Sequence, residues 1–552
     1  MSTVHLDPGA GSVLARVGSV LALLGLLAGG KALAQLPPPP VPAGNPLTPE
    51  KIVLGKMLFW DEQLSSDNTV ACGTCHRPEL GGSDPRLVPT PGRDGIPGTP
   101  DDPFGSPGVI HSDASNDYAP DPLHDFRPRV TTRNAPSFIG AQYFTDLFWD
   151  GRAPSTFVDP VTGTVSLAIG GALESQCVGP PTSDVEMAHE ARSWTQVTSK
   201  LTGVEPLKLA TSLPPDIQTA LAINPTYPLL FDAAFGTPDI TAERIAFAIA
   251  SYERILIPDR TPFDRFSMGD TTALTPAQQA GLGIFLSRNC AVCHTPPFFS
   301  DDRFHNIGLR PVVEDRGLQG TTGLIPDRGK FKTPGLRNVG LRVRFMHNGR
   351  FTTLLQVVNF YNGGGVFPDN RDPIIRPLGL GPVQRNQLVD FLENGLTDPR
   401  VAAALPPFDR PTLHSELATP NPLVYGASSP GTGGLEPLMI ATVPPNLANP
   451  DFRLGIGHGL GGATAHLFIS ANPAATTTSG GIPLNVDLST SRRHRILSLA
   501  GVGAGQGFAT FHVSIPDLPG LAGRTLYAQW FVQDASATGG FAASLGAELT
   551  LF

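Results

Sequence analysis

The sequence predicts a multidomain protein in which two similar, mainly α-helical domains are followed by an all-β sandwich domain. Three observations lead to this prediction. One order of helix, cysteine motif and Arg-Asn segment occurs twice before about residue 405. Beyond that point, short apolar or alternating stretches are separated by Gly, Pro, Asn and Ser, as in all-β domains. A chain of 552 residues also has room for several domains, each with its own core.

The composition indicates a globular protein with many loops. Charged residues make up 16% of the chain, whereas Gly (61) and Pro (57) are abundant. The chain therefore lacks the charge density of a disordered protein. The formal net charge of −9 argues against a nucleic-acid partner, because phosphate binding requires clustered Lys and Arg.

The N-terminus, residues 1–34, is predicted to be a cleaved signal peptide. Arg16 precedes the apolar run VGSVLALLGLLAGG, and the small residues Ala32 and Ala34 lie before a cleavage site at Gln35. The run is too short to predict a membrane span, and the prolines that follow argue against the alternative of a buried helix. We therefore expect an exported protein, in the periplasm, with no membrane span after cleavage.

The first helical domain is expected over residues 35–260 and the second over 261–405. LTPEKIVLGKMLF begins at Leu47 and LTPAQQAGLGIFL begins at Leu274. Both place Thr at the helix cap and Pro at the first helical position, followed by apolar residues at helical spacing. Each of the two predicted helices leads into a Cys-x-x-Cys-His motif.

The similarity between the two domains continues downstream of these motifs. TRNAPSFIGAQYFTDLFWDGR (132–152) is echoed by LRNVGLRVRFMHNGR (336–350), since both contain Arg-Asn and end in Gly-Arg. Recurrence of several features in the same order indicates two homologous domains.

After a Pro-, Gly- and Ser-rich linker at 406–435, residues 436–552 are predicted to form a β-sandwich of seven or eight strands. The expected strands lie in LMIATV, AHLFISA, PLNVDL, RILSLAGV, GFATFHVSI, TLYAQWFVQD and AELTLF. This region contains no cysteine and no evident catalytic cluster. We expect a docking or structural role for it.

The two Cys-x-x-Cys-His motifs predict two covalently bound haems of the c type. They account for four of the five cysteines, leaving Cys177, and consist of Cys72, Cys75 and His76 and of Cys290, Cys293 and His294. A haem of this type needs two thiols three residues apart and a His next in the chain to reach the iron. A zinc ribbon would place its second cysteine pair some 15–20 residues on, whereas these pairs are about 215 residues apart.

The chain from about 46 to 400 closely resembles the bacterial di-haem cytochrome c peroxidases, including the MauG branch. The resemblance rests on GKMLFWDEQLSSDNTVACGTCHRPELGGSD, RNAPS, LFWDGRA, VEM, NCAVCH and FKTPGLRNVGLRVRFMHNG, in this order. The β-rich end lies outside it. The family implies a helical cytochrome c-like fold for both haem domains, with an N-terminal peroxidatic haem and a C-terminal electron-transfer haem.

The resemblance also implies roles for residues near the first haem. Gln176 and, ten residues later, Glu186 match the distal pair of the family. Glu186 is expected to move a proton between the peroxide oxygens, and Gln176 to hold peroxide or water. A solvent-exposed helix residue is the alternative for Glu186 taken alone. Trp149 matches a tryptophan that relays electrons between the haems, although a lone Trp often serves only in packing.

Two further matches concern metal ions. Asn134 matches an Asn that binds calcium between the haem domains, together with backbone carbonyls that here fall at Arg342 and Arg344. The sixth ligand of the C-terminal haem falls on Tyr361, as in the MauG branch, where ordinary family peroxidases have Met. Met346 and His347 are the competitors for this place, and a Tyr packed beside the haem is the alternative for Tyr361.

A distal His that caps the N-terminal haem in ordinary peroxidases has no clear counterpart. The corresponding segment is a longer insert that contains His111 and His124, and a loop His in solvent is the interpretation we favour for each.

The predicted function is therefore a di-haem peroxidase, an oxidoreductase that reduces hydrogen peroxide with electrons passed from the C-terminal to the N-terminal haem. A small redox protein, a cytochrome c or a cupredoxin, is the expected electron donor. Two alternatives remain open at this point. One is a MauG-like oxidase that acts on a protein or small substrate through a shared high-valent state. The other is a non-catalytic di-haem electron-transfer protein.

Overall fold

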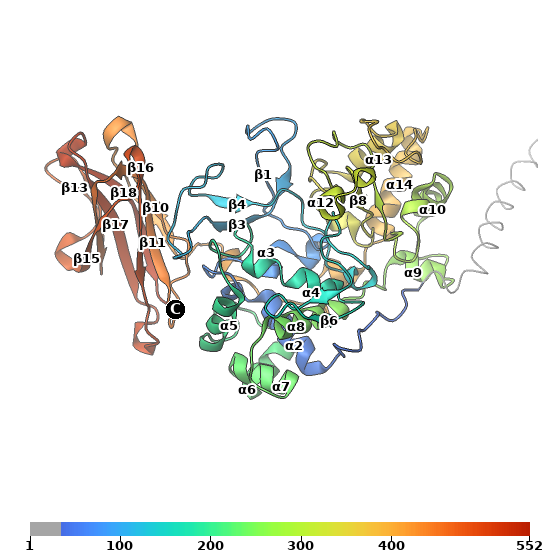
Figure 1. The fold of residues 1–552 in the computed structure, drawn as a ribbon, viewed down its shortest axis with the longest axis horizontal. Coiled ribbons are helices and arrows are strands. Elements are labelled where there is room, and N and C mark those ends of the chain that lie inside the picture. The colour runs from blue at the N-terminus through green and yellow to red at the C-terminus, as the bar shows by residue number, and fades with distance from the viewer. Residues whose placement is uncertain (1–34) are drawn as a thin grey trace, which may run out of the picture.

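The computed structural model describes residues 35–552, which form two helical parts and a β-rich part at the C-terminal end of the chain (Figure 1). The predicted signal peptide, 1–34, lies outside the described residues. Among residues 35–552, no helix has both the length and the apolar character needed to cross a membrane.

The two predicted helix starts are confirmed. Helix α2 (Pro49–Trp60) follows Thr48, and helix α10 (Pro276–Ser287) follows Thr275. Each Thr hydroxyl accepts a hydrogen bond of 3.2 Å from a backbone N–H in the first turn, and Pro occupies the first helical position.

A close crossing of α2 and α8 (Ala242–Arg254) forms the centre of the first helical part. Gly55 makes the crossing possible, because a Cβ atom there would lie 1.8 Å from the Ala248 carbonyl oxygen. This part also contains α3 (Cys72–Cys75), α4 (Ala172–Cys177), α5 (Trp194–Gly203), α6 (Pro215–Ile223), α7 (Tyr227–Phe235), and three strand pairs, β1 (Val88–Pro89) with β2 (Phe104–Gly105), β3 (Pro107–Ile110) with β4 (Pro128–Val130), and β5 (Phe157–Val158) with β6 (Val165–Leu167).

The second helical part has its own core, in which α10 packs on α14 (Pro382–Asp390). Gly281 repeats the close approach seen in the first part, since a Cβ atom there would lie 2.1 Å from the Gln387 carbonyl oxygen. The other elements are α9 (Pro262–Ser267), α11 (Cys290–Cys293), α12 (Gln319–Thr322), α13 (Leu354–Gly363), α15 (Pro399–Ala402), and the strand pair β7 (Phe304–His305) and β8 (Phe331–Lys332).

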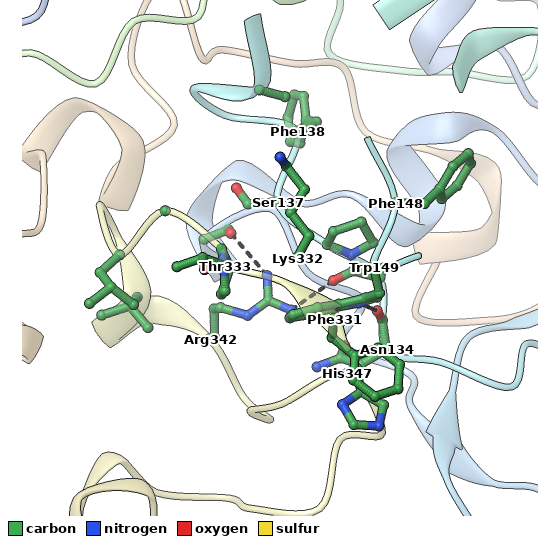
Figure 2. Close-up of a pocket in the computed structure, with 18 of the residues that line it drawn as sticks. Asn134, Ser137, Phe138, Phe148, Trp149, Phe331, Lys332, Thr333, Arg342 and His347 are labelled. Atoms are coloured by element: carbon green, nitrogen blue, oxygen red, sulfur yellow. Dashed lines mark hydrogen bonds between the residues drawn. The ribbon is translucent and has the colours of Figure 1, made fainter. Parts of the chain in front are cut away.

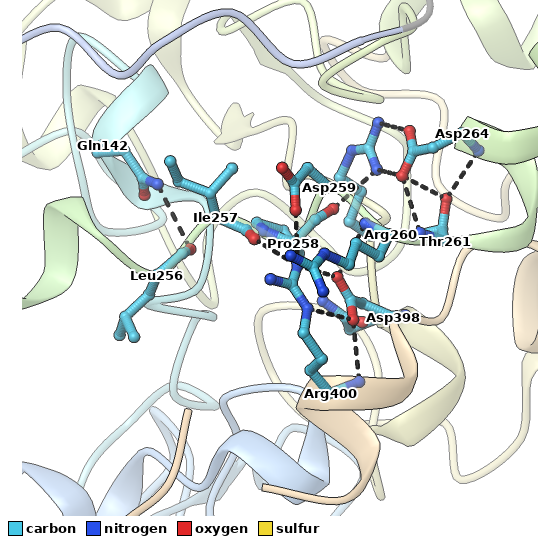
Figure 3. Close-up of polar contacts among 12 residues, drawn as sticks. Gln142, Leu256, Ile257, Pro258, Asp259, Arg260, Thr261, Asp264, Asp398 and Arg400 are labelled. Atoms are coloured by element: carbon cyan, nitrogen blue, oxygen red, sulfur yellow. Dashed lines mark hydrogen bonds and ion pairs between the residues drawn. The ribbon is translucent and has the colours of Figure 1, made fainter. Parts of the chain in front are cut away.

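Hydrogen bonds and a partly exposed ion pair join the two helical parts next to the predicted boundary at 260–261 (Figure 3). Asp398 is fully buried and accepts a 2.9 Å hydrogen bond from the Arg260 backbone N–H. Arg400 contacts Asp398 at 2.7 Å, Asp259 at 2.6 Å and the Ile257 carbonyl oxygen at 3.0 Å. A charge buried at this junction is stabilised only while its partners stay in place.

The segment predicted as a linker, 406–435, does not run free between domains. Phe408 and Leu413 are buried in the core of the first helical part. Arg410 pairs with Glu79 at 2.5 Å, next to the first cysteine motif. Further on, β9 (Leu423–Tyr425) joins the larger sheet of the β-rich part. The prolines and glycines of this segment therefore shape a packed connection.

Two sheets that share one core make up the β-rich part. The smaller has the order β10-β11-β16 and the larger the order β15-β12-β17-β18-β9, while β13 and β14 form a separate hairpin. The bounds are β10 (Leu438–Ile440), β11 (Phe452–Gly461), β12 (Thr464–Ser470), β13 (Pro473–Thr477), β14 (Pro483–Val486), β15 (Ser491–Ser498), β16 (Gly503–Val513), β17 (Thr525–Gln533) and β18 (Phe541–Thr550).

Strand β11 was not among the expected strands because four glycines interrupt its apolar pattern. These glycines allow close packing, because the long insert of the first helical part lies against them. A Cβ atom at Gly455 would lie 2.5 Å from the Tyr118 ring, and one at Gly457 would lie 2.6 Å from the Phe126 ring. Arg453 adds a cation over the Tyr118 ring, 4.5 Å from its centre. The insert therefore docks the β-rich part on the first helical part.

Candidate functional site

A cavity of about 660 Å³ is lined by residues of both Cys-x-x-Cys-His motifs. Side chains from the first and second helical parts meet around it, as Figure 2 shows for Asn134, Trp149, Arg342 and His347. The fold thus brings together motifs that are far apart in the sequence.

In the first motif, the short helix α3 carries both cysteines and packs on α2. Gly73 allows this contact, because a Cβ atom there would lie 2.1 Å from the Trp60 ring. Neither Cys72 nor Cys75 forms a disulfide. His76 directs its Nδ1 atom to the Gly82 carbonyl oxygen at 3.3 Å, and its burial lowers its pKa. The imidazole is therefore held neutral, with Nε2 left for another partner.

The second motif repeats this arrangement on α11. Its cysteines, Cys290 and Cys293, form no disulfide. The Nδ1 atom of His294 lies 3.0 Å from the Phe299 carbonyl oxygen and 3.2 Å from that of Pro334. Burial again lowers the pKa of the imidazole. A His that donates from Nδ1 to a carbonyl and keeps Nε2 free is oriented as a metal ligand.

This donor chemistry fits a covalently attached haem at each motif. Two unpaired thiols and one oriented, neutral imidazole face the same cavity in both cases. The thiols supply the bonds to the vinyl groups, and the imidazole supplies one axial ligand.

Gln176 and Glu186 lie together on the wall of the cavity beside the first motif. Gln176 is placed by α4, and Glu186 lies in the irregular segment that follows. Strand β3 of the insert holds that segment, since a Cβ atom at Gly108 would lie 1.9 Å from the Val185 carbonyl oxygen. Both residues that match the distal pair of the family therefore line this cavity.

Burial raises the pKa of the Glu186 carboxyl group above its usual range. The charge of Arg152 and a hydrogen bond with Ser183 oppose this rise. Arg152 also lines the cavity and lies over the Phe148 ring, 3.6 Å from its centre. A carboxyl group whose pKa moves toward neutrality can both give and take a proton. No role for Arg152 was predicted from the sequence, although it is the last residue of the LFWDGR segment that resembles the family.

Trp149 lines the cavity and is fixed by contacts on two sides. Its indole N–H donates to the Asn134 carbonyl oxygen at 2.7 Å, and its own carbonyl accepts from the Lys332 backbone N–H at 2.9 Å. Its ring meets His347 edge to face, with 6.3 Å between the ring centres. Trp149 therefore lies where residues of the two helical parts meet.

Tyr361, on α13, lines the same cavity as the second motif. Burial raises the pKa of its phenol, and the neighbouring thiols of Cys293 and Cys290 raise it further. Within residues 35–552 the structure records no hydrogen bond for its hydroxyl group. The half-buried phenol therefore lies beside the two thiols of the second motif.

The two competitors of Tyr361 also line the cavity, and the His347 ring is engaged with a neighbouring ring. The ring of His347 stacks on that of Phe331, with 3.5 Å between centres, and burial lowers its pKa to about 4. Met346 has a positive φ of 71°, and its carbonyl oxygen lies 3.4 Å from the Asn134 side-chain nitrogen.

Asn134 is buried between the two helical parts. Its side-chain nitrogen donates to the Arg344 carbonyl oxygen at 3.1 Å, while its side-chain oxygen has no hydrogen-bond partner within the described chain. The Arg344 carbonyl was predicted to lie here. The Arg342 carbonyl was predicted as well, but it is not among the contacts of Asn134, and Met346 supplies the second carbonyl instead.

Neither histidine of the insert lines the cavity. His124 lies 3.4 Å from the Thr90 hydroxyl group, and His111 lies 3.2 Å from the Ala119 carbonyl oxygen. The remaining cysteine, Cys177, is buried on the cavity wall and contacts Glu253, whose pKa burial raises to about 8. This buried carboxyl group was not found from the sequence, because only the fold brings α8 beside α4.

Comparison with known proteins gives consistent matches. A family model described as di-haem cytochrome c peroxidase matches residues 49–272. The chain is 30% identical over 404 residues to the cytochrome-c peroxidase IdrP1 of Denitromonas iodatirespirans, spanning 67% of this chain and 88% of that protein. It is 30% identical over 370 residues to the methylamine utilization protein MauG of Methylorubrum extorquens, spanning 66% and 84%. A solved MauG-like protein associated with microbial copper homeostasis matches with a TM-score of 0.48 and 24% identity, covering 68% of this chain and 96% of that one.

Proposed function

The chain belongs to the di-haem cytochrome c peroxidase family, which includes MauG, and on this basis we propose how its own residues carry out the reaction. The protein is a di-haem peroxidase, an oxidoreductase that reduces hydrogen peroxide. The observation that carries the proposal is the shared cavity, where both motifs meet the Gln176 and Glu186 pair.

Both haems are of the c type and are bound by thioether bonds to the two motifs. His76 and His294 would each hold a haem iron through Nε2. This proposal is supported by the unpaired thiols and by the carbonyls that hold each Nδ1 atom. Cys72→Ala or Cys290→Ala should therefore yield protein that carries one covalent haem fewer. Mass spectrometry checks this, and an unchanged mass increment of two haems in either variant contradicts it.

Glu186 and Gln176 act on peroxide at the first motif. When bound, the haem there would supply the iron and the electrons for cleavage of the O–O bond. Glu186 accepts the proton of the near peroxide oxygen at its carboxylate and delivers it to the leaving oxygen, so that water departs. Gln176 holds peroxide by hydrogen bonds from its amide. The raised pKa of Glu186 supports a role in which the group changes protonation state.

Electrons reach this site from the second motif by way of Trp149. A small redox protein, a cytochrome c or a cupredoxin, delivers them at the surface. The position of Trp149 between residues of the two helical parts supports this path. The chain is proposed to work after export to the periplasm.

Tyr361 would hold the iron of the second haem through its hydroxyl oxygen. A phenolate is a hard anionic donor that favours ferric and higher states, and so it favours sharing of oxidation between the two haems. This feature supports a second candidate function, a MauG-like oxidase that acts on a protein or small substrate. The burial of Tyr361 beside both thiols of the second motif supports the ligand assignment.

Asn134 and the carbonyls of Arg344 and Met346 are proposed to hold a calcium ion. Turning the Asn134 amide by half a rotation would direct its unpartnered oxygen at these two carbonyls, in place of the nitrogen that now contacts them. The three oxygens would then suit calcium, which prefers oxygen donors. A chelator should then lower the melting temperature of the wild-type protein but not that of Asn134→Ala. A wild-type melting temperature that does not respond to chelator contradicts the proposal.

Stopped-flow mixing with peroxide tests the function as a whole. The reduced protein should react within seconds, with a change in the haem spectrum. A spectrum that peroxide leaves unchanged on this timescale would favour the electron carrier. Product analysis with and without a redox protein donor then separates peroxidase from oxidase.

A further inference from the structure

Arg342 is a half-buried cation on the cavity wall that no acidic side chain of the described chain neutralises. The guanidinium group comes from the second helical part and contacts two backbone carbonyls of the first. It donates to the Ala135 carbonyl oxygen at 2.7 Å and, weakly, to that of Gly81 at 3.5 Å. Figure 2 shows it pointing toward the centre of the residues drawn.

Several fully buried arginines in this fold are paired with a carboxylate. Arg254 contacts Glu174 at 2.7 Å, and Arg337 contacts Asp264 at 2.8 Å. These pairs are expected, because a charge taken out of water is costly unless it meets an opposite charge.

Arg192 has no carboxylate partner either. Its guanidinium group instead donates hydrogen bonds to backbone carbonyl oxygens. Its Nη1 atom donates to three carbonyl oxygens at 2.7, 3.1 and 3.4 Å, and it does not line the cavity. Arg342 has one short contact and one long one, so most of its five N–H donors are left to face the cavity. This arrangement calls for an anion that enters the cavity.

The position of Arg342 relates it to the first motif. The Gly81 carbonyl that it contacts precedes that of Gly82, which holds the Nδ1 atom of His76. A Cβ atom at Gly81 would lie 3.1 Å from the Arg342 side chain, so the two backbones approach closely. The cation thus lies beside the proximal side of the first motif, although it comes from the second repeat.

We propose that Arg342 binds a propionate carboxylate of the haem attached at Cys72 and Cys75. The inference rests on the proposed function, in that it takes a c-type haem at this motif. Haem brings two carboxylates into the cavity, and a guanidinium group binds a carboxylate through two parallel hydrogen bonds. Arg342 thereby ties the second helical part to the cofactor of the first and neutralises one of its charges.

The test is a spectroelectrochemical titration of the full, haem-loaded protein as a function of pH. In the wild type, the propionate paired with Arg342 stays ionised throughout the titration. Neither haem potential should therefore change with pH because of this group. In Arg342→Gln the unpaired propionate leaves a negative charge near the iron, which favours the ferric state. One haem potential should fall, and it should gain a pH dependence as the propionate takes up a proton on reduction.

Arg350→Gln is the matched control. Arg350 lies eight residues away, is exposed, has no carboxylate partner in the described chain and does not line the cavity. Its replacement should leave both potentials and their pH dependence unchanged. Arg342→Lys, which keeps the charge, should restore the wild-type potential.

Unchanged potentials and pH dependence in a folded Arg342→Gln overturn the inference, even when the wild type carries two haems and reacts with peroxide. Absence of haem or of peroxide reaction in the wild type instead overturns the proposed function. If Arg342→Gln does not fold, redox-induced infrared difference spectra of Arg342→Lys decide. The propionate carboxylate band should shift, because one ammonium group replaces a fork of two donors, and an unshifted band overturns the inference.

Discussion

Glu186 illustrates how burial alters the pKa of a single side chain. The carboxyl group lies on the cavity wall, where loss of water raises its pKa and Arg152 limits the rise. Burial also raises the pKa of the Tyr361 phenol, and the nearby cysteine thiols raise it further. In both cases the residue type provides the chemistry, and the surroundings decide which protonation state is available.

Replacing Glu186 with Gln should leave both haems bound and slow the peroxide reaction by about 10²–10⁴-fold, the usual cost of losing one general acid–base group. The measurement is the stopped-flow rate at saturating peroxide. Glu190→Gln serves as the control, since Glu190 is exposed and does not line the cavity. A near wild-type rate in Glu186→Gln would remove this carboxyl group from the mechanism.

Replacing Tyr361 with Phe should change the low-spin ferric signal of the second haem or convert it to high spin, because the oxygen ligand is lost. Electron paramagnetic resonance of the ferric protein checks this. Tyr143→Phe is the control. Tyr143 also lines the cavity, but its hydroxyl donates to the Pro37 carbonyl oxygen at 2.8 Å. A signal that stays as in the wild type in Tyr361→Phe would restore the Met-type interpretation.

At the scale of elements, glycines decide how closely neighbouring segments approach. Gly55 sets the crossing of α2 and α8, and Gly281 sets that of α10 and α14. Gly108 performs the same task for β3 against the segment that carries Glu186. These positions show why helical apolar spacing alone predicts that a helix exists but not how near its partner lies.

Gly55→Ala should destabilise the protein, by about 1–3 kcal/mol or more, since the new methyl group would lie 1.8 Å from the Ala248 carbonyl oxygen and force the helices apart. Chemical denaturation measures the loss. Gly283→Ala is the matched control within α10, because a Cβ atom there meets nothing within 4 Å. It should stabilise the helix by about 0.5–1 kcal/mol. Equal effects of the two substitutions would contradict the packing argument.

At the scale of the whole molecule, the insert of the first helical part holds the β-rich part in place. Tyr118 and Phe126 lie against the glycines of β11. Polar contacts surround them. His512 on β16 lies 2.9 Å from Asp117 of the insert and 2.5 Å from Asp451. Hydrogen bonds to Asp451 and Asp117 raise the pKa of His512 against the opposing effect of burial.

The raised pKa of His512 predicts a pH-dependent contact. The charged imidazole stabilises the folded state fully below its unfolded pKa of about 6.5, and this contribution is lost as pH rises through the folded pKa. His512→Gln should therefore lower the melting temperature in mildly acidic buffer and have little effect in alkaline buffer. We expect no more than about 1 kcal/mol, because the pair is partly exposed. A mutational effect that does not change with pH, measured by calorimetry, would contradict this account.

The sequence by itself determined the chemistry of the site. Cysteine and histidine spacing, the Gln176 and Glu186 pair and the starts of α2 and α10 depend on residues close together in the chain, so they are visible without a structure. The β-rich end followed from alternating apolar stretches, which are also local.

Only the tertiary structure decided which distant residues meet. It placed Arg342 beside the first motif, turned the glycines of β11 into a docking surface for Tyr118 and Phe126, and packed much of the expected linker. These features depend on contacts between segments hundreds of residues apart, and no periodicity along the chain records them. The role of a glycine in a strand, or of an unpaired arginine, can be assigned only when the group beside it is known.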